Sequence, residues 1–221
     1  MLFVLEGLDG AGKSTQAAML SDYLANAWKV RTKQLHFPRF DTPVYGELIA
    51  KFLRGDFGDI NAVPPYLVAL LFAADRHAAA ATICTWIAEG HCVMVDRYVY
   101  SNIAYQCAKL DDAGHRQALR QFILDMEYRH FDIPKPHLSV FLDVPLTHIA
   151  EKLREERAGS DRDYLQGKKD IHETNLELQQ KVRQIYLEQE ALDPTFKVIP
   201  CADGNRMLAP EQIFNQLKAL M

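Results

Sequence analysis

The chain has 221 residues, of which 48% are hydrophobic and 24% charged, and its formal net charge at pH 7 is −4. This composition is that of an ordinary globular domain and excludes the collagen-like, disordered and disulfide-scaffold classes. The slightly acidic balance argues against a partner that is a nucleic acid polymer or a membrane surface, and the longest apolar run, residues 66–74, is far shorter than the roughly 20 residues of a membrane span.

Short apolar runs alternate along the chain with longer helical patterns, which is typical of β-α-β units on a parallel sheet. The predicted strands are residues 2–6, 30–36, 91–96, 138–143 and 197–200. The predicted helices are residues 13–27, 44–54, 66–89, 99–109, 115–130, a segment from 145 onward, 175–190 and 210–220. The alternation predicts a single α/β domain over residues 1–221, in which helices flank a five-stranded parallel sheet in three layers.

The turn after the first predicted strand reads Gly-Leu-Asp-Gly-Ala-Gly-Lys-Ser over residues 7–14, which fits the phosphate-binding pattern GxxxxGK[ST]. Glycines let backbone N–H groups approach phosphate oxygens, and the N-terminus of the next helix adds partial positive charge. Lys13 can reach the β- and γ-phosphates, and the Ser14 hydroxyl can bind Mg²⁺. The pattern predicts a P-loop NTPase fold with these ATP-binding residues: Gly7, Leu8, Asp9, Gly10, Ala11, Gly12, Lys13, Ser14 and Thr15.

Asp96 ends the third predicted strand, at the sheet edge where α/β proteins bind ligands. In P-loop proteins an acid at such a strand end serves Mg²⁺, so Ser14 and Asp96 are the candidate metal ligands. Capping of the next helix is the alternative for Asp96. A GTPase switch is not favoured, because the chain has no NKxD and its DxxG match at 111–114 follows a helical pattern.

Residues 96–106, Asp-Arg-Tyr-Val-Tyr-Ser-Asn-Ile-Ala-Tyr-Gln, closely resemble the DRYxxSxxAYQ signature of thymidylate kinases. Further segments of that family agree in order along the chain: Phe-Pro-Arg at 37–39, Leu-Phe-Ala-Ala-Asp-Arg at 71–76, Leu-Asp-Val-Pro at 142–145 and Asp-Ile-His-Glu at 170–173. The resemblance implies a nucleoside monophosphate kinase that uses ATP and Mg²⁺ to convert dTMP to dTDP, for dTTP synthesis, and that forms a homodimer. A deoxynucleoside kinase acting on thymidine and a non-catalytic P-loop nucleotide-binding regulator are the alternatives.

The predicted base site combines a flat ring with hydrogen-bonding side chains. Phe72 and Arg76 lie four residues apart and share one helix face. The resemblance implies that thymine stacks on Phe72 with its 4-carbonyl held by Arg76; core packing of Phe72 and a structural salt bridge of Arg76 are the alternatives. Asn102 can donate and accept at once, which suits the N3–H and O4 edge of thymine. By the same resemblance, Tyr105 lies under the sugar and excludes a 2′-hydroxyl.

The predicted phosphate site is cationic. Arg39 and Arg97 can hold the acceptor monophosphate with bidentate donors, although Arg39 is also explained as a surface arginine of a loop. The resemblance assigns Asp9 to positioning the sugar and Arg39 rather than to general-base catalysis, because a phosphate acceptor has no proton to remove. The candidate substrate-binding residues are Asp9, Phe37, Arg39, Phe72, Arg76, Arg97, Ser101, Asn102, Tyr105 and Gln106.

Gly10 stands where some thymidylate kinases carry a P-loop arginine, so the chain resembles the bacterial type, in which a short mobile lid supplies arginines. We expect this lid at about 154–170, in a segment of dense mixed charge for which a solvated helix face is the alternative. The candidate catalytic residues are Asp9, Lys13, Arg97, Arg157 and Arg162. His172, just beyond the lid, is interpreted as an incidental helix residue.

Two features of the chain bear on its location. The four cysteines form no CxxC pair, which is typical of free thiols in a reducing cytosol. The first residues reach Glu6 without a basic region, unlike those of a signal peptide. We therefore expect a cytoplasmic protein.

Overall fold

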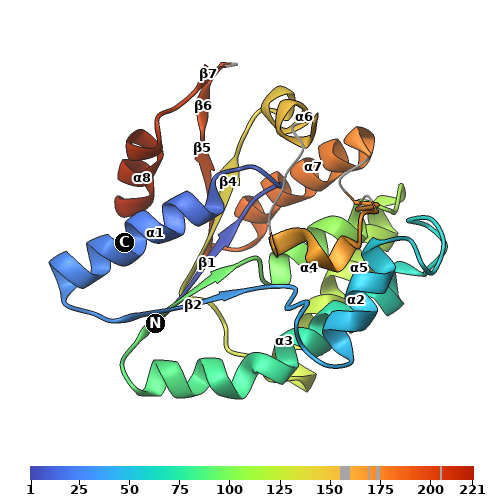
Figure 1. Ribbon diagram of the computed structural model, residues 1–221, viewed down its shortest axis with the longest axis horizontal. Helices are drawn as coiled ribbons and strands as arrows, with labels where there is room; N and C mark the ends of the chain where they lie inside the picture. The colour runs from blue at the N-terminus through green and yellow to red at the C-terminus, as the bar shows by residue number, and fades with distance from the viewer. Residues whose placement is uncertain (155–159, 169, 173–174, 205) are drawn as a thin grey trace.

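Five parallel strands form one sheet in the computed structural model, which describes residues 1–154, 160–168, 170–172, 175–204 and 206–221 (Figure 1). The strands are β1 (Leu2–Glu6), β2 (Thr32–His36), β3 (Cys92–Asp96), β4 (Leu138–Asp143) and β5 (Phe196–Pro200). Their order across the sheet is β2-β3-β1-β4-β5, so β1 is central. The prediction of a five-stranded parallel sheet is confirmed, and β1 and β4 have the predicted bounds.

Helices cover both faces of this sheet. They are α1 (Lys13–Tyr23), α2 (Tyr45–Leu53), α3 (Pro65–Ala88), α4 (Val99–Cys107), α5 (Ala113–Asp125), α6 (Leu146–Arg154), α7 (Leu176–Leu192) and α8 (Pro210–Lys218). Helices α1 and α8 pack together on one face, and α3, α4, α5 and α7 pack on the other, which gives the three predicted layers (Figure 1).

The structure differs from the sequence-based prediction mainly at the ends of elements. The helices predicted at 13–27 and 115–130 each finish in a five-residue π-helical turn, η1 (Leu24–Trp28) and η2 (Met126–His130). A short antiparallel pair, β6 (Ala202–Asp203) and β7 (Arg206–Met207), follows β5 and was not predicted. Two-residue strands are too short to show the alternation that identifies a strand in a sequence.

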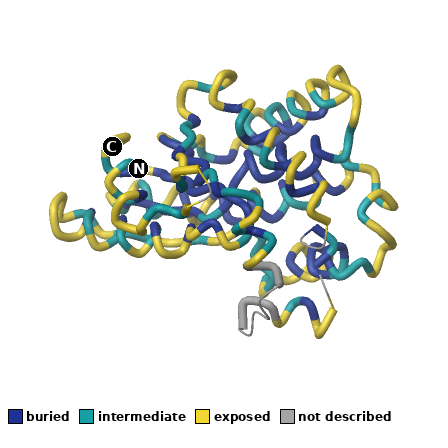
Figure 2. Tube along the Cα trace, turned by 90° about the horizontal axis from the view of Figure 1, so that it is seen from above, coloured by how far each residue is buried: buried dark blue, intermediate teal, exposed yellow. Residues whose placement is uncertain are grey.

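The buried core residues lie in the sheet and on the helix faces packed against it, while most exposed residues lie on the outer parts of the helices and in the loops (Figure 2). Among the described residues, α3 is long and apolar enough to cross a membrane by length and composition. A core helix passes the same test, and α3 packs on α2, α4 and β3. It also carries Asp75 and Arg76, both buried and both in ion pairs, as a helix inside a globular domain does.

Register places the two main motifs at one edge of the sheet. β1 and β3 are parallel neighbours in which Leu5 pairs with Asp96, so both strands end at the same level. The P-loop leaves the carboxyl end of β1, and the segment that begins at Asp96 leaves the carboxyl end of β3. In open α/β sheets, this edge is where ligands bind.

Candidate active site

A cavity of about 880 Å³, called the main cavity below, lies at the carboxyl ends of β1, β2 and β3. Most of the predicted site residues line it: Asp9, Gly10, Gly12, Lys13, Ser14, Thr15, Phe37, Phe72, Arg76, Asp96, Arg97, Ser101, Asn102, Tyr105 and Gln106. Of the predicted residues in the described part of the chain, Gly7, Leu8, Ala11 and Arg39 do not line it. The fold thus brings segments more than 90 residues apart into one hollow.

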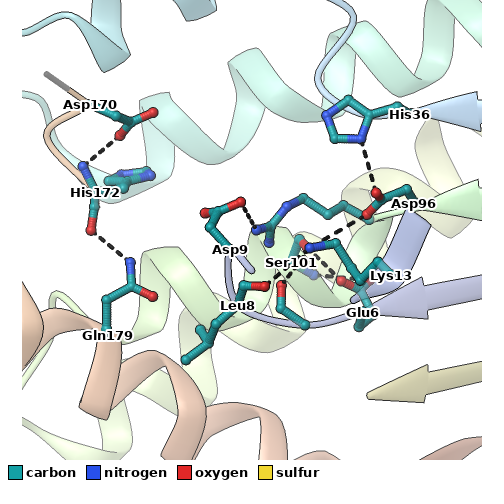
Figure 3. Close-up of polar contacts among 12 residues, drawn as sticks. Glu6, Leu8, Asp9, Lys13, His36, Asp96, Ser101, Asp170, His172 and Gln179 are labelled. Carbon is teal, nitrogen blue, oxygen red and sulfur yellow. Dashed lines mark hydrogen bonds and ion pairs between the residues drawn. The ribbon is translucent and has the colours of Figure 1, made fainter. Parts of the chain in front are cut away.

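The P-loop provides the anion-binding part of the main cavity. Gly10 and Gly12 have φ angles of 85° and 84°, in the left-handed region that favours glycine. Gly12 precedes α1 without a side-chain cap, so the first-turn N–H groups and the helix dipole remain available to an anion. The Lys13 ammonium donates to the carbonyls of Gly7 and Leu8, each at 3.2 Å (Figure 3). Burial lowers the pKa of Lys13, as does Arg97, while nearby acids oppose the shift.

Asp96 lies between two basic groups. Its Oδ1 is 3.8 Å from the Lys13 Nζ, and its Oδ2 is 3.4 Å from the Nδ1 of His36 (Figure 3). Burial alone would raise the pKa of Asp96, but Lys13 and His36 outweigh it and hold this pKa below its usual value. Oδ1 is buried without a hydrogen-bond partner in the described structure. An ionised carboxylate oxygen of this kind, in a cavity that Ser14 also lines, suits the hard oxygen ligation of Mg²⁺.

No group of three or more His, Cys, Asp or Glu side chains that could hold a metal occurs among the described residues.

The guanidinium of Arg97 is a charged hydrogen-bond donor in the lining of the main cavity. One terminal nitrogen donates to Asp9 Oδ1 at 3.0 Å, whereas Nη1 is buried without a hydrogen-bond partner. Burial works against its charge, yet Asp9 reverses the effect and the pKa of Arg97 lies well above its usual value. A permanently charged guanidinium with an unused N–H pair is a site for a phosphate oxygen.

The Arg39 side chain binds Asp75 and does not line the main cavity. Its Nε donates to Asp75 Oδ1 at 2.9 Å and its Nη2 to the Asp75 carbonyl at 2.8 Å. Asp75 is almost fully buried on α3, and a buried carboxylate is stable only with a partner such as this guanidinium. The structure therefore uses Arg39 to neutralise Asp75, and its contact with an acceptor phosphate stays a prediction.

Arg76 forms a buried ion pair, the structural alternative left open by the sequence. Its Nε and Nη2 donate to the two carboxylate oxygens of Glu127 at 2.5 and 2.6 Å, and the side chain is only 2% exposed. Arg76 also lines the main cavity beside Phe72, so the pairing orients the guanidinium at the cavity wall. Glu127 was not identified from the sequence. The available signal was an arginine in an apolar helix, which indicates a buried charge that must be paired with an acid.

The amide of Asn102 is fixed by two acceptors. Its Nδ2 donates to the Ala69 carbonyl and to Glu127 Oε1, each at 3.0 Å. This assigns the opposite edge of the amide to Oδ1, which is buried in the cavity wall without a partner. A buried, unpaired acceptor at this point suits a ligand N–H group.

Ser101 lines the main cavity, but its hydroxyl is hydrogen-bonded to residues that do not line it. It hydrogen-bonds to Glu6 and, at 2.7 Å, to the Tyr186 hydroxyl. Glu6 also accepts from the backbone N–H of Tyr98 and Ser101 at 2.9 and 3.2 Å, so it caps α4. The direct contact of Ser101 with substrate stays a prediction, whereas its visible role is to tie the start of α4 to β1.

Glu6 was not singled out in the sequence, although a charged residue ends an otherwise apolar strand there. Its side chain is fully buried, and burial raises its pKa. Because its oxygens are occupied by several donors and it does not line the main cavity, Glu6 is not placed to remove a proton from a substrate hydroxyl.

His172 is not an incidental helix residue; that interpretation is wrong. It lies in a turn before α7, is 6% exposed and lines the main cavity with Asp170. Its ring stacks on Tyr105, with centroids 4.9 Å apart and an interplanar angle of 26°. The segment was noticed through its resemblance to other kinases, but no sequence periodicity predicts a stack between residues 67 positions apart.

The predicted lid falls partly outside the described residues. Arg157 lies there, and Arg162 belongs to the 3₁₀ helix η3 (Ser160–Leu165) with its side chain outside the described part. At the end of η3, Tyr164 stacks on Phe40 with centroids 3.7 Å apart and donates to Asp170 Oδ2 at 2.9 Å. These contacts join the end of the predicted lid to the wall of the main cavity.

Comparisons with known proteins agree on one family. The thymidylate kinase family model matches residues 5–208. The chain is 35% identical to thymidylate kinase of Mycobacterium tuberculosis (strain ATCC 25618 / H37Rv) over 191 residues, 86% of each chain. It is 34% identical to a probable thymidylate kinase of Thermococcus kodakarensis over 228 residues, covering 100% of this chain and 97% of the relative. The solved thymidylate kinase of Candida albicans superposes with a TM-score of 0.73 at 29% identity, covering 99% of this chain and 89% of that one.

Proposed function

Because the chain belongs to the thymidylate kinase family and is a phosphotransferase that makes dTDP from ATP and dTMP, we propose a division of its main cavity between the two nucleotides. The P-loop, with Lys13 and Ser14, holds the phosphates of ATP. The wall formed by Phe72, Arg76 and Asn102 holds thymine. Arg97 lies between them and binds the acceptor phosphate.

The unpartnered Nη1 of Arg97 carries this proposal. A buried cationic donor is left unsatisfied by a nucleoside, which has no charge, and satisfied by a monophosphate. The acceptor oxygen of a monophosphate is already ionised, so catalysis consists of positioning and of stabilising charge on the transferring group. Asp9 serves here as a positioning residue, because its carboxylate holds the Arg97 guanidinium.

Magnesium is the cofactor we propose, held by Asp96 and Ser14. The buried, ionised and unpartnered Oδ1 of Asp96 supports this assignment. When bound, the ion neutralises charge on the donor phosphates.

The two alternatives are less well supported. A thymidine kinase needs a general base for a neutral hydroxyl, and Glu6, the carboxylate at the end of β1, is occupied by α4 and Tyr186. A non-catalytic regulator needs no more than an ATP site, whereas this cavity also carries Arg97, Asn102 and a stacking ring in Phe72.

We expect ADP release to require dTMP and Mg²⁺, and thymidine to give no turnover above background. A coupled ADP assay with ATP and either acceptor, before and after addition of EDTA, measures this. Because thymidine lacks the phosphate that pairs with Arg97, turnover of thymidine at the rate of dTMP would overturn the assignment of Arg97.

Lid arginines complete the proposed phosphate site. Gly10 leaves Lys13 as the cationic side chain of the P-loop, and the transferring group spreads negative charge over three oxygens. We propose that Arg157 and Arg162 supply further charge when the lid closes over ATP.

Replacing either lid arginine with alanine should lower kcat and kcat/KM together by about 10²-fold, since an arginine in related chemistry contributes about 10³–10⁵-fold and two share the task here. The melting temperature should stay nearly constant, because a segment of such dense charge is costly to bury and charges in solvent contribute about 0.5 kcal/mol or less. Steady-state kinetics and melting curves of Arg157→Ala and Arg162→Ala decide the matter. A near-normal kcat in both variants would contradict the proposal that the lid arginines supply charge to the transferring group.

We further propose a cytoplasmic homodimer. Apolar side chains that remain exposed on α3 and α5 support an interface between copies: Tyr66, Leu67, Leu70 and Phe122. Tyr66 and Phe122 already contact one another across the two helices, with ring centroids 5.0 Å apart, so exposed apolar side chains of α3 and α5 meet. An exposed apolar patch of this kind is typical of a protein–protein contact.

A further inference from the structure

His172 is held in place from both sides of its backbone. Its N–H donates to Asp170 Oδ1 at 2.7 Å, and its carbonyl accepts from Gln179 Nε2, on α7, at 2.7 Å (Figure 3). Both partners are themselves buried. The preceding residue, Ile171, donates to the Leu53 carbonyl at 3.0 Å. The ring position is therefore built into the fold and is not an accident of a surface turn.

The imidazole of His172 contacts two aromatic rings. It stacks on Tyr105 and meets Phe52 edge-on, with centroids 5.5 Å apart and an angle of 72°. Its Nε2 is buried and has no hydrogen-bond partner in the described structure, although His172 and Tyr105 both line the main cavity. A buried polar atom left unpaired in a binding cavity is explained when a ligand supplies the partner.

The charge state of His172 restricts what that ligand group is. Burial holds the pKa of His172 well below its usual value, and the positive charges of Lys109 and Arg97 lower it further. The imidazole is therefore neutral at physiological pH and offers one donor and one acceptor nitrogen. A neutral imidazole supplies no positive charge to offset that of a phosphate dianion, whereas its N–H group is a suitable donor to a hydroxyl.

The acceptor nucleotide has three polar regions, and two of them already have partners in the proposed site. Asn102 and Arg76 face the base, and Arg97 and Lys13 face the phosphates. The 3′-hydroxyl of the deoxyribose is the region that remains. A hydroxyl donates one hydrogen bond and accepts others, so it can donate to the Asp9 carboxylate while it accepts from an imidazole N–H.

We propose that His172 determines recognition of the acceptor sugar: its Nε2–H donates to the 3′-hydroxyl of dTMP, and its ring holds Tyr105 in the position that excludes a 2′-hydroxyl. This inference rests on the proposed placement of dTMP in the main cavity. It assigns to one residue two separable effects, a hydrogen bond and a stack.

Two substitutions separate these effects. His172→Phe keeps a ring on Tyr105 and Phe52 but removes the nitrogen, whereas His172→Ala removes both. His77→Phe is the matched control, because His77 also stacks on a phenylalanine, Phe131, at 4.7 Å but lies on the outer side of α3, away from the cavity. The probes are dTMP, 3′-deoxythymidine monophosphate and ribothymidine monophosphate, each assayed by ADP release with ATP.

We expect the wild-type protein to use dTMP about 100-fold better than the 3′-deoxy analogue, because the analogue loses both hydrogen bonds of the 3′-hydroxyl and each such bond is worth about 10-fold. His172→Phe should raise KM for dTMP about 10-fold and leave KM for the 3′-deoxy analogue unchanged, so that the preference for dTMP falls about 10-fold and the part due to Asp9 remains. Its discrimination against ribothymidine monophosphate should persist. His172→Ala should in addition lose that discrimination, and His77→Phe should behave as wild type.

Equal changes of KM for dTMP and the 3′-deoxy analogue in His172→Phe would show a purely structural role and overturn the hydrogen bond. If His172→Ala retains the preference for deoxyribose, the proposal that the His172 ring holds Tyr105 in position is overturned. If His172→Ala does not fold, His172→Phe alone still decides the first effect. Failure of the proposed dTMP site is distinguishable, because the wild-type protein would then not discriminate between dTMP and thymidine in the same assay.

Discussion

The protein is expected to use dTMP about 10⁴-fold more efficiently than dCMP, as measured by kcat/KM for each monophosphate at saturating ATP, because a site built for one hydrogen-bond pattern rejects another by that order. The acceptor Oδ1 of Asn102 suits the N3–H of thymine, whereas N3 of cytosine carries no hydrogen. The Asn102 amide cannot rotate to exchange its oxygen and nitrogen, since Nδ2 donates to the Ala69 carbonyl and to Glu127. Cytosine would also present its amine to the guanidinium of Arg76, donor against donor.

The control for this prediction is dUMP, which lacks only the methyl group and should be used within about 10–200-fold of dTMP. Asn102→Leu, of similar shape, should reduce the preference for dTMP over dCMP to the part that Arg76 maintains and leave KM for ATP unchanged. Arg76→Ala is a weaker test than Asn102→Leu. It would leave Glu127 buried without its cation, at a cost of about 3–5 kcal/mol of stability. Better use of dCMP than of dTMP by the wild-type protein would contradict the placement of thymine.

Lys13→Ala is expected to lower kcat by about 10²–10³-fold, the usual effect of removing one preorganised charge from the transition state. The Lys13 ammonium lies among the P-loop carbonyls and near Asp96, in the loop proposed to hold the donor phosphates. Burial lowers the pKa of Lys13, so the fold desolvates this charge at a cost in free energy. Steady-state turnover of dTMP, beside a melting curve, gives the measurement.

The matched control for Lys13→Ala is Lys33→Ala, on β2, whose ammonium lies over Trp86 outside the main cavity. That variant should turn over dTMP like the wild type. Asp96 loses one cation in Lys13→Ala but keeps His36 at 3.4 Å, so a small change in melting temperature is expected. Unchanged turnover in a folded Lys13→Ala protein would remove the P-loop lysine from the mechanism.

The elements and the nucleotide loop were predictable from the sequence because both are local patterns. The apolar run Leu2–Glu6 followed by glycines defines β1 and the P-loop within a dozen residues. Asp96 ends a short apolar strand, and its place beside the P-loop follows from the rule that parallel strands share an edge. The spacing of Phe72 and Arg76 put both on one helix face, and both line the main cavity.

The partners of the charged side chains were decided by the tertiary structure alone. Arg39, expected at the acceptor phosphate, is bound to Asp75 in this structure, and the hydroxyl of Ser101, a candidate substrate-binding residue, is bound to Glu6. Their contacts with substrate stay predictions. His172 reaches Tyr105 across a long stretch of chain. Periodicity reports which face of an element a residue occupies, but not which distant charge or ring will meet it there. That choice depends on desolvation, because each ion buried by packing must take whichever opposite charge the fold brings within reach.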